Sequence, residues 1–393
     1  MNPPRPETAR GQPTAAPVPV RDTVTRTSRV ISDVDELAAL RDDWARLRTD
    51  VPGATTTPDW VLAHARALRP EDRFCGVAVF EGGRMIAFAP LTVVASAARH
   101  LAWLHTGNLS AAYYGDASHL PDLMTAVFGL RRPIRLAGLV PGSPTERALL
   151  DHRPPGWIAV ALPWLAGPSL ALDDTWVDPI AKLSAKRRSD MRRTLRKAEA
   201  LGDVRFDAFT SPPPDEVNEL FEDFLRIEAS GWKGAVGTAL EHDAPQREGL
   251  RRYLTGAVAA GPVRITRMRI GEDTAAIHLN AIGERRSWGL KAAVHAAYMH
   301  ASPGLHLMAF SIGAAAEEGC EYFEFMGATA PFKEMWGGKP NPMTLHRLYP
   351  PNAAGVTAVM LDGSRRGAKK LARWSTTQTG AAAERMRERR SDR

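Results

Sequence analysis

Four residues in the second half of the chain have side chains that can move a proton or steady a developing negative charge. They are Glu228, His278, Lys291 and Glu324. Glu324 stands in the middle of a predicted strand, CEYFEFMG, whose aromatic residues predict an apolar setting. A carboxylate that is buried and unpaired there has a raised pKa and suits a general base acting on an ammonium. A structural salt bridge to Lys291 or Lys333 explains Glu324 equally well.

The other three residues also have two interpretations each. Alternation in the predicted strand 287–294 groups Lys291 with Gly289 and Ala293, which makes Lys291 a partner for a phosphate, a carboxylate or an oxyanion, or else a solvated lysine. His278 can relay a proton, although a lone strand histidine is more often structural. Glu228 ends the apolar stripe of a predicted helix at 215–230. With the Trp232 and Lys233 that follow, it forms either the wall of a site or a frayed helix end.

The segment HASPGLH at 300–306 predicts a helix start that can bind an anion. Pro303 suits the first turn of a helix, where a missing N–H costs nothing, and Gly304 lets a ligand approach the backbone closely. The free N–H groups of that turn, together with the helix dipole, attract negative charge. Pyrophosphate is a natural occupant, and a plain turn before a helix is the alternative.

A predicted helix at 184–201 has a dense cationic face. Its basic residues are Lys186, Arg187, Arg188, Arg192, Arg193, Arg196 and Lys197. Such a face can hold coenzyme phosphates, an acidic acceptor or RNA, or it can simply be solvated. No recognised DNA-binding motif accompanies it, so reading of a DNA duplex is not expected.

The elements that position these residues alternate between helix and strand along the chain, which indicates an α/β (α+β layered) fold. The first 28 residues are rich in Pro, Thr, Ala and Arg and predict a disordered arm. A connector at 163–168 separates two stretches of similar pattern. We therefore expect one domain at 29–168, a second at 169–350, and a basic tail at 351–393 that is either a surface helix or disordered.

Composition excludes several classes of protein. The 393 residues carry a net charge of +7, a modest excess that is compatible with anionic partners. Two cysteines, Cys75 and Cys320, cannot build a disulfide framework or a cysteine-based zinc site. The sequence lacks a GxxxxGK[ST] loop, HExxH, GxSxG and a GxGxxG after a strand, and it suggests no metal. We expect no transmembrane helix and no secretory signal, and hence a cytoplasmic protein.

Three ordered segments resemble a known family. RSDMRRTLRKAEALGDVRF, FLRIEASGWKGAVGTAL, and GLKAAV followed by SPGLHLMAFSIGAAAEEGCEYFEFMGATAPFKEMWGG are similar to GNAT-superfamily proteins of the CelD/BcsL type, which are related to the FemABX transferases. The resemblance covers roughly residues 180–340. It implies tandem GNAT-like domains, each a mixed twisted sheet flanked by helices, of which the first is degenerate.

The resemblance also implies where a thioester donor binds. Acyl-CoA would lie in the splay between strands 287–294 and 320–325, with pantetheine along Leu290 and Ala292. The pyrophosphate would lie at Ala301, Ser302, Pro303, Gly304, Leu305 and His306. The expected substrate contacts are Arg188, Arg192, Trp232, Lys233, Lys333 and Trp336.

The function expected from these observations is N-acyl transfer. A small-molecule or peptide amine attacks a thioester of CoA or of an acidic acyl carrier protein, with Glu324 or Glu228 as base, directly or through His278, and with a strand N–H and Lys291 at the oxyanion. One alternative is a FemABX-like amide-forming transferase that uses aminoacyl-tRNA. Another is a non-catalytic GNAT-like scaffold in envelope-polysaccharide or natural-product assembly.

Overall fold

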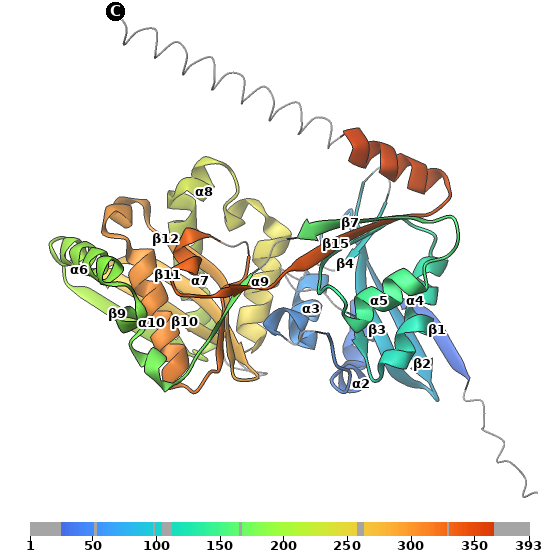
Figure 1. Ribbon diagram of the computed structural model, residues 1–393, viewed down its shortest axis with the longest axis horizontal. Coiled ribbons are helices and arrows are strands. Elements are labelled where there is room, and N and C mark those ends of the chain that lie inside the picture. The colour runs from blue at the N-terminus through green and yellow to red at the C-terminus, as the bar shows by residue number, and fades with distance from the viewer. Residues whose placement is uncertain are drawn as a thin grey trace, which may run out of the picture.

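The computed structural model describes residues 25–50, 53–96, 99–103, 112–164, 167–257, 263–327 and 330–364. These residues build two twisted sheets, each flanked by helices, that lie side by side (Figure 1). The predicted α/β architecture with two layered domains is therefore confirmed. Within the described residues, no helix combines the length and the apolar character needed to cross a bilayer.

The first sheet has the strand order β1-β2-β3-β4-β6-β15-β7, with β5 paired to β3. Neighbouring strands are antiparallel except β4 and β6, which run parallel. The strands are β1 (Arg26–Ile31), β2 (Arg73–Glu81), β3 (Arg84–Val93), β4 (Leu101–Trp103), β5 (Tyr113–Tyr114), β6 (Ile134–Leu139), β7 (Ile158–Trp164) and β15 (Met343–Tyr349).

The second sheet has the order β14-β8-β13-β12-β11-β10-β9. Its parallel pair is β12 and β13, and its other neighbours are antiparallel. The strands are β8 (Pro168–Ala171), β9 (Val204–Thr210), β10 (Val263–Ile270), β11 (Asp273–Gly283), β12 (Arg286–Val294), β13 (Tyr322–Glu324) and β14 (Lys339–Pro340).

One strand crosses from the second half to the first sheet. β8 follows β7 directly and begins the second sheet, where it pairs with β13. β15 returns from the end of the second half and inserts between β6 and β7 of the first sheet. Figure 1 shows β15 crossing between the two halves. The predicted domain at 169–350 is therefore wrong for β15, because an extended segment does not specify its pairing partner locally.

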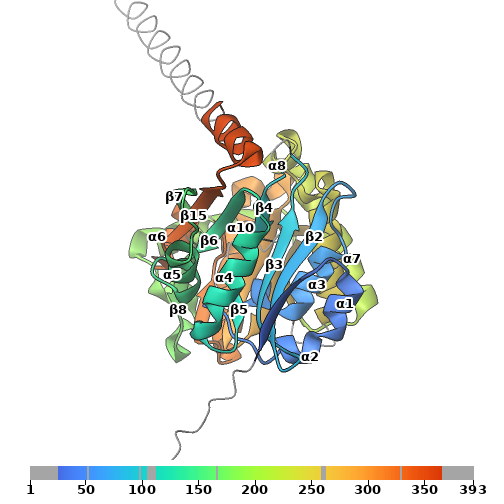
Figure 2. The same ribbon diagram turned by 90° about the vertical axis from the view of Figure 1, so that its right-hand side faces the viewer.

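The helices form three layers around the two sheets. α3, α7 and α9 pack between the sheets, α4 and α5 cover the outer face of the first sheet (Figure 2), and α6 and α10 cover the outer face of the second. Proline occupies the first turn of α3, α4, α5, α7, α10 and α11, as its fixed φ favours. The helices are α1 (Val34–Ala39), α2 (Arg41–Trp44), α3 (Pro58–Ala65), α4 (Leu120–Gly129), α5 (Pro144–Asp151), α6 (Ala185–Glu199), α7 (Pro214–Ser230), α8 (Trp232–Ala235), α9 (Ala244–Ala257), α10 (Pro303–Glu317) and α11 (Pro331–Glu334).

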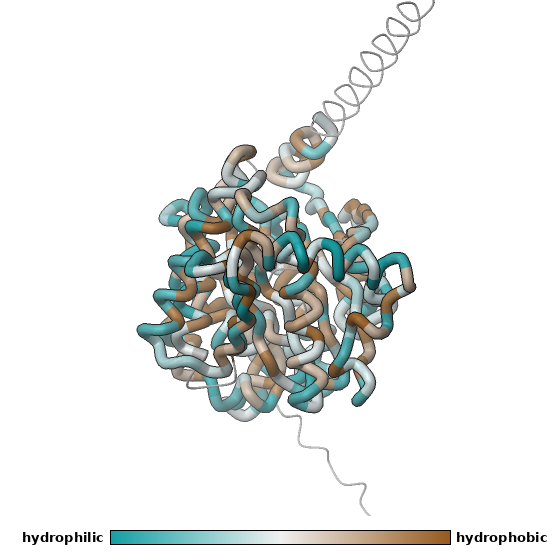
Figure 3. The backbone as a smooth tube through the Cα atoms, turned by 90° about the vertical axis from the view of Figure 1, so that its left-hand side faces the viewer, coloured by the Kyte–Doolittle hydropathy of each residue, from teal (hydrophilic) through white to brown (hydrophobic). Residues whose placement is uncertain are grey.

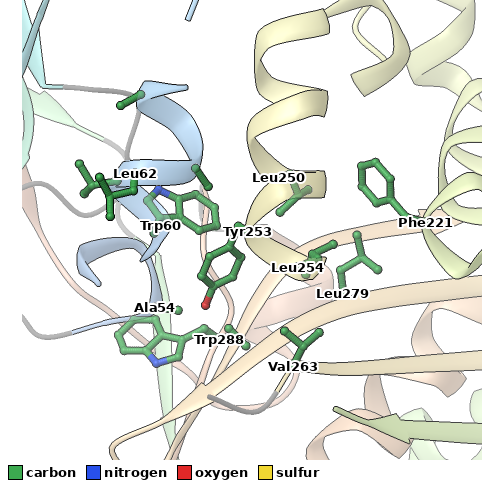
Figure 4. Packing of buried hydrophobic residues seen from close by; sticks show 14 of the residues in the cluster. Ala54, Trp60, Leu62, Phe221, Leu250, Tyr253, Leu254, Val263, Leu279 and Trp288 are labelled. Atoms are coloured by element: carbon green, nitrogen blue, oxygen red, sulfur yellow. The ribbon is translucent and has the colours of Figure 1, made fainter. Parts of the chain in front are cut away.

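The largest apolar cluster joins the two halves. Figure 4 shows Trp60 and Leu62 of α3 beside Leu250 and Tyr253 of α9, with Trp288 of β12 below them. The Trp60 and Tyr253 rings meet edge to face with centroids 4.8 Å apart. Because this cluster is continuous, α3 of the first half is held in place beside the second sheet.

Both ends of the described chain differ from their predictions. The arm predicted at 1–28 is too long, because Arg26 already pairs with Glu81 as β1 joins the edge of the first sheet; residues 1–24 lie outside the described part. The tail predicted from residue 351 contains a helix at 353–364. Its Ala358 packs on Tyr349, and Asp362 accepts a hydrogen bond from the Tyr349 hydroxyl at 2.7 Å. Residues 365–393 lie outside the described part.

Candidate functional site

The two parallel strands of the second sheet separate shortly after they meet. β12 and β13 pair only from Arg286 opposite Tyr322 to Trp288 opposite Glu324. β13 then ends, because Met326 and Gly327 adopt positive φ values of 44° and 69° that turn the chain out of the sheet. β12 continues to Val294 without a parallel neighbour. This is the splay that the resemblance predicts.

A β-bulge lies at the mouth of the splay. Gly289 stands opposite Asn280 and Lys291 opposite Leu279, so Leu290 is the extra residue. The bulge shifts the alternation by one position. Gly289 therefore shares a face with His278, whereas Lys291 faces α9, where its Nζ donates to Gln246 Oε1 at 2.8 Å. The predicted grouping of Lys291 with Gly289 is wrong for this reason.

A groove of about 460 Å³, here called the α10 groove, runs from the splay to the first turn of α10. Its walls are largely apolar and come from β12, the residues before α10, α10 itself and the ends of α7 and α11. The lining includes Ala292, Val294, Met299, Leu305, Met308 and Phe332. Ser302, Pro303 and Gly304 close its far end. An extended apolar arm with an anionic terminus fits this shape.

The first turn of α10 is open to an anion. Ser302 adopts a left-handed conformation with φ 53°, and its side chain does not cap the helix, nor does any carboxylate lie in that turn. Gly304 approaches Val294 closely, since a Cβ there would be 2.8 Å from Val294 Cγ2. The backbone of 302–305 thus lines the groove near the positive end of the helix dipole. Ser302 N–H donates to the Met299 carbonyl and Leu305 N–H to the Ser302 carbonyl, so among the described residues of this turn Gly304 N–H is the amide left for an anion.

Two of the predicted pyrophosphate residues face the core. Ala301 is fully buried against α6. The His306 ring nitrogen Nε2 meets Thr194 Oγ1 at 2.9 Å, and burial lowers the pKa of His306 to about 4. The prediction is wrong for these two side chains, because they lie on the inner face of the turn, where they fix α10 to α6.

A second cavity of about 390 Å³, the composite cavity, adjoins the α10 groove through Lys233, Ala292, Met308 and Phe332. Residues of both halves line it. Gly289, Leu290 and Lys291 belong to the second half, whereas Thr55, Trp60 and His64 come from the first. His278, Gln246 and Lys333 complete the polar lining. The groove and the composite cavity meet at the splay.

His278 lies buried at the base of the composite cavity. Its Nδ1 meets Ser311 Oγ at 3.2 Å, and Ser311 in turn shares a 2.7 Å hydrogen bond with Thr266 Oγ1. Burial lowers the pKa of His278 to about 4, with a further contribution from the Lys333 charge. Gly289 leaves room for the other ring nitrogen, since a Cβ there would be only 2.9 Å from Nε2. The neutral imidazole thus turns Nε2 toward the bulge.

Three lysines line the composite cavity. Burial lowers the pKa of Lys291 and of Lys333. Lys333, in α11, donates to the Met326 carbonyl at 2.5 Å. Lys233 donates to Glu228 Oε1 at 2.6 Å, while Glu228 Oε2 accepts the Leu240 N–H at 2.7 Å. Both Glu228 oxygens are therefore engaged in tying α7 to the loop that follows it.

Glu324 lies on the opposite face of β13 from Phe323 and Phe325. Its Oε1 accepts hydrogen bonds from Ser169 Oγ at 2.9 Å and from Arg286 Nη1 at 2.5 Å. The expected salt bridge exists, but its partner is Arg286 and neither Lys291 nor Lys333. Glu324 faces a separate cavity of about 530 Å³ between the halves, here called the Glu324 cavity.

The remaining predicted residues lie away from these cavities. Arg188 donates to the Leu183 carbonyl at 2.5 Å, and Arg192 is exposed on α6, which contributes no lining residue. Trp336 is only 2% exposed and packs in the core beside Phe325, so its prediction as a substrate contact is wrong. Trp232 begins α8, but its side chain lies outside the described part of the structure.

Sequence reasoning missed several lining residues. Thr55, Trp60 and His64 precede the second domain by more than a hundred positions and carry no motif. Gln246 lies on an ordinary amphipathic helix. Ser311, which does not line the cavity but holds His278, had a signal, because a polar residue on the apolar helix 303–317 needs a hydrogen-bond partner.

Comparison with known families agrees with this geometry. Residues 185–334 match the sequence model of the family described as an acetyltransferase (GNAT) domain. These residues form a GNAT-superfamily domain. The predicted GNAT-superfamily resemblance is thereby confirmed for this part of the chain, and it supports an acyltransferase.

Two solved structures with a TM-score of 0.50 share the fold over most of this chain. The C-terminal DUF2156 domain of an Agrobacterium fabrum protein described as a "putative lysylphosphatidylglycerol synthetase" is 14% identical, with a TM-score of 0.50 over 84% of this chain and 96% of that one. A conserved protein of unknown function from Bacteroides thetaiotaomicron is 10% identical, with a TM-score of 0.50 over 82% and 99%. A tandem GNAT protein from the clavulanic acid biosynthesis pathway is 13% identical, with a TM-score of 0.46 over 83% and 98%. No curated protein matches the chain.

Proposed function

We propose that this GNAT protein transfers an acyl group from acyl-CoA to a primary amine. The observation that supports the proposal is that three features of the second half follow one another in space without a break. The splay opens between β12 and β13, the apolar α10 groove leads away from it, and the groove ends at the uncapped first turn of α10. A thioester, a pantetheine arm and a diphosphate have the same order in acyl-CoA.

The bond changes are a direct transfer. The amine nitrogen attacks the thioester carbonyl, the C–S bond breaks, and the CoA sulfur leaves with a proton while the nitrogen loses one. Positioning supplies much of the rate, since both substrates are bound side by side. A backbone N–H at the Leu290 bulge, where the ladder to β11 is interrupted, is suited to donate to the oxyanion.

His278 is the base that the geometry favours. Its Nε2 faces the bulge beside Gly289, and its Nδ1 is held by Ser311. At neutral pH its low pKa leaves the imidazole uncharged and able to accept a hydrogen bond from the attacking amine. Glu228 and Glu324 remain alternatives, but each already accepts hydrogen bonds from two protein groups. In this proposal they position neighbouring segments.

A charge change at Ser302 tests the donor site. Ser302→Asp places a carboxylate in the α10 groove, whereas Ser302→Asn has nearly the same shape without the charge. Both residues tolerate the left-handed backbone, and Asp also favours a helix start, so neither variant should unfold the protein. Like charges 4 Å apart repel by about 1 kcal/mol even in water. We therefore expect Ser302→Asp to weaken acetyl-CoA binding at least about fivefold.

Calorimetric titration with acetyl-CoA measures this effect. Ser302→Asn should bind within about twofold of the wild type. Ser118→Asp, at an exposed position just before α4, is the matched control in the first half and should change nothing. If Ser302→Asp binds acetyl-CoA as well as the wild type does, or if the wild type binds no acyl-CoA, the proposed donor site is wrong.

A further inference from the structure

The composite cavity has an unusual charge balance for a site that takes an amine. Three lysines (Lys233, Lys291 and Lys333) line it, and none of its described lining residues is Asp or Glu. The lining also includes His64 and the uncharged His278. Within this group, Lys233 is ion-paired with Glu228 at the boundary with the α10 groove. A protonated polyamine would be repelled here, and a negatively charged group would be attracted.

Lys291 is the cation best placed to receive that group. It is half-buried, and its Nζ donates to the neutral amide oxygen of Gln246 at 2.8 Å. The acidic groups that favour its charge, Glu228 and Asp243, act over distance, and Glu228 is already neutralised by Lys233. A partly desolvated ammonium whose contact is with an amide gains strongly from an added anion.

Thr55 gives an independent sign of a missing ligand. Its side chain is 1% exposed, it lines the same cavity, and its hydroxyl has no hydrogen-bond partner within the described part of the chain. A buried hydroxyl that donates to nothing destabilises the folded protein, so such groups normally have a partner. A bound carboxylate or phosphate oxygen would accept this hydrogen bond.

The wall that carries Thr55 is held firmly. α3 packs against α9 so closely that a Cβ on Gly249 would be 2.6 Å from His64 Cδ2. His64 stacks on Trp60 with ring centroids 4.3 Å apart, and its Nδ1 meets the Trp60 carbonyl at 2.9 Å. Figure 4 shows Trp60 of this wall beside α9. The first half therefore presents a preformed surface to the cavity.

We propose that the composite cavity binds a carboxylate or phosphate of the acceptor, so that the acceptor is an amine that also carries a negative charge. The inference rests on the proposed acyl transfer and names its substrate class. Thr55, His64 and Gln246 line the composite cavity and not the α10 groove, which assigns the anion to the acceptor and not to the donor. The first half then acts as part of the acceptor site.

A binding experiment tests the anion site without turnover. Inorganic phosphate is titrated calorimetrically into the full chain, with and without saturating CoA. Lys291→Met keeps the length of the side chain and removes the charge, and Lys186→Met removes one charge from exposed α6 as a control. Lys291→Met should weaken phosphate binding about tenfold or more, as expected for a hydrogen bond to a charged group, whereas Lys186→Met should not. Equal phosphate binding by the wild type and Lys291→Met would overturn the proposal.

Thr55→Val separates binding from folding. Valine removes an unpartnered hydroxyl at nearly constant shape, so the melting temperature should stay the same or rise. Phosphate affinity should nevertheless fall severalfold. A lower melting temperature with unchanged phosphate affinity would show that Thr55 has a structural partner and does not bind the anion.

Turnover identifies which substrate carries the anion. The rate of CoA release is measured with two pairs of acceptors, glycine with glycinamide and phosphoethanolamine with ethanolamine. Within each pair, the rates are compared at equal concentrations of the unprotonated amine. The anionic member of each pair should have a kcat/KM about tenfold higher or more, and Lys291→Met should abolish that preference. Equal rates within the pairs, or a Lys291-dependent preference for succinyl-CoA over acetyl-CoA, would overturn the assignment to the acceptor. If CoA fails to bind while phosphate binding still depends on Lys291, the proposed function fails and the anion site stands.

Discussion

The two halves of the molecule use the same topology, yet only one retains an open helix start. In the first half α4 connects the parallel strands β4 and β6, and in the second α10 connects β12 and β13. The first turn of α4 holds Asp122, which is bound to Arg26 at 2.8 Å. The first turn of α10 has no acidic residue. A carboxylate occupies the positive end of a helix dipole just as a phosphate would, so the proposed diphosphate site is at α10 and not at α4.

The first strand of each parallel pair also differs between the halves: the strand of the second half is irregular, and that of the first half is regular. β12 has a bulge at Leu290 where it leaves β13, and this bulge exposes backbone at the splay. In the first half, the three-residue strand β4 pairs with β3 in regular register. The first half contributes Thr55, Trp60 and His64 to the composite cavity instead. In the proposed function the second half therefore holds the donor, and the first half forms a wall of the acceptor site.

The largest expected effect is the loss of turnover on changing His278. His278→Asn keeps an acceptor near the Nδ1 position for Ser311 and removes Nε2, which faces the bulge. A base that assists proton transfer contributes about 10²- to 10⁴-fold, so kcat should fall by that range with acetyl-CoA affinity retained. Steady-state kinetics and calorimetry measure the two quantities.

Glu324→Gln serves as the comparison for His278→Asn. Glu324 anchors Arg286 and Ser169 and faces the Glu324 cavity, so this change should lower kcat less than tenfold. A loss in Glu324→Gln as large as that in His278→Asn, with normal stability, would move the base to Glu324. It would also place the acceptor on the opposite side of the splay.

The sequence predicts most helices and strands because their signals are local. The helix start at Pro303, the apolar stripe of α7 and the strands of the second sheet come from periodicity and first-turn prolines. The insertion of β15 into the first sheet is decided by pairing over a large sequence separation. The face of Lys291 depends on a single bulged residue, Leu290, and bulges carry no reliable sequence signature.

The candidate site was partly predictable for the same reason. Ser302 and Gly304 could be predicted, because they lie beside Pro303 at a helix start that the local sequence indicates. Residues predicted from their side-chain type alone, such as Trp336 and His306, were assigned to the site wrongly, because the structure buries both side chains in the core. Thr55 was out of reach, because its part in the cavity depends on how α3 packs on α9.

β15, which inserts into the first sheet, and β8, which begins the second sheet, should differ in how much their anchors stabilise the fold. β15 is tied to α5 of the first half through Glu146, which accepts from Thr344 at 2.7 Å and contacts His346 at 2.6 Å. β8 is tied to β13 by the Ser169 hydroxyl on Glu324. Glu146→Gln should lower the free energy of unfolding by about 1–3 kcal/mol and Ser169→Ala by about 1 kcal/mol or less, as urea denaturation would show. Equal losses would remove the difference between the two anchors.

The anchor of β15 should also weaken in acid. Burial opposes the charge of Glu146, but hydrogen bonds from Thr344, His346 and the Gly142 N–H outweigh it and hold its pKa below the ordinary value. A lowered pKa stabilises the fold above the unfolded value, about 4.3 for Glu, and this contribution disappears as the pH falls through the folded pKa. The unfolding free energies of the wild type and Glu146→Gln should therefore differ at pH 7 and converge below about pH 4. A difference that stays constant with pH would show that the charge of Glu146 is not involved.

The smallest expected effect concerns α6, whose basic face would dock a carrier protein or tRNA if either were the donor. α6 lies at the outer edge of the second half (Figure 1), where hydrophilic and hydrophobic residues alternate along the chain seen from that side (Figure 3). It lines neither the α10 groove nor the composite cavity. With acetyl-CoA as donor, Arg192→Gln combined with Lys197→Gln should change kcat/KM less than about twofold, since exposed charges contribute little. The same pair should weaken an acyl carrier protein or aminoacyl-tRNA donor strongly and in a salt-dependent way. If wild-type turnover requires such a donor and is lost in the double variant, then the donor of this half is a macromolecule bound by α6, and the α10 groove receives only its pantetheine arm or its acceptor end.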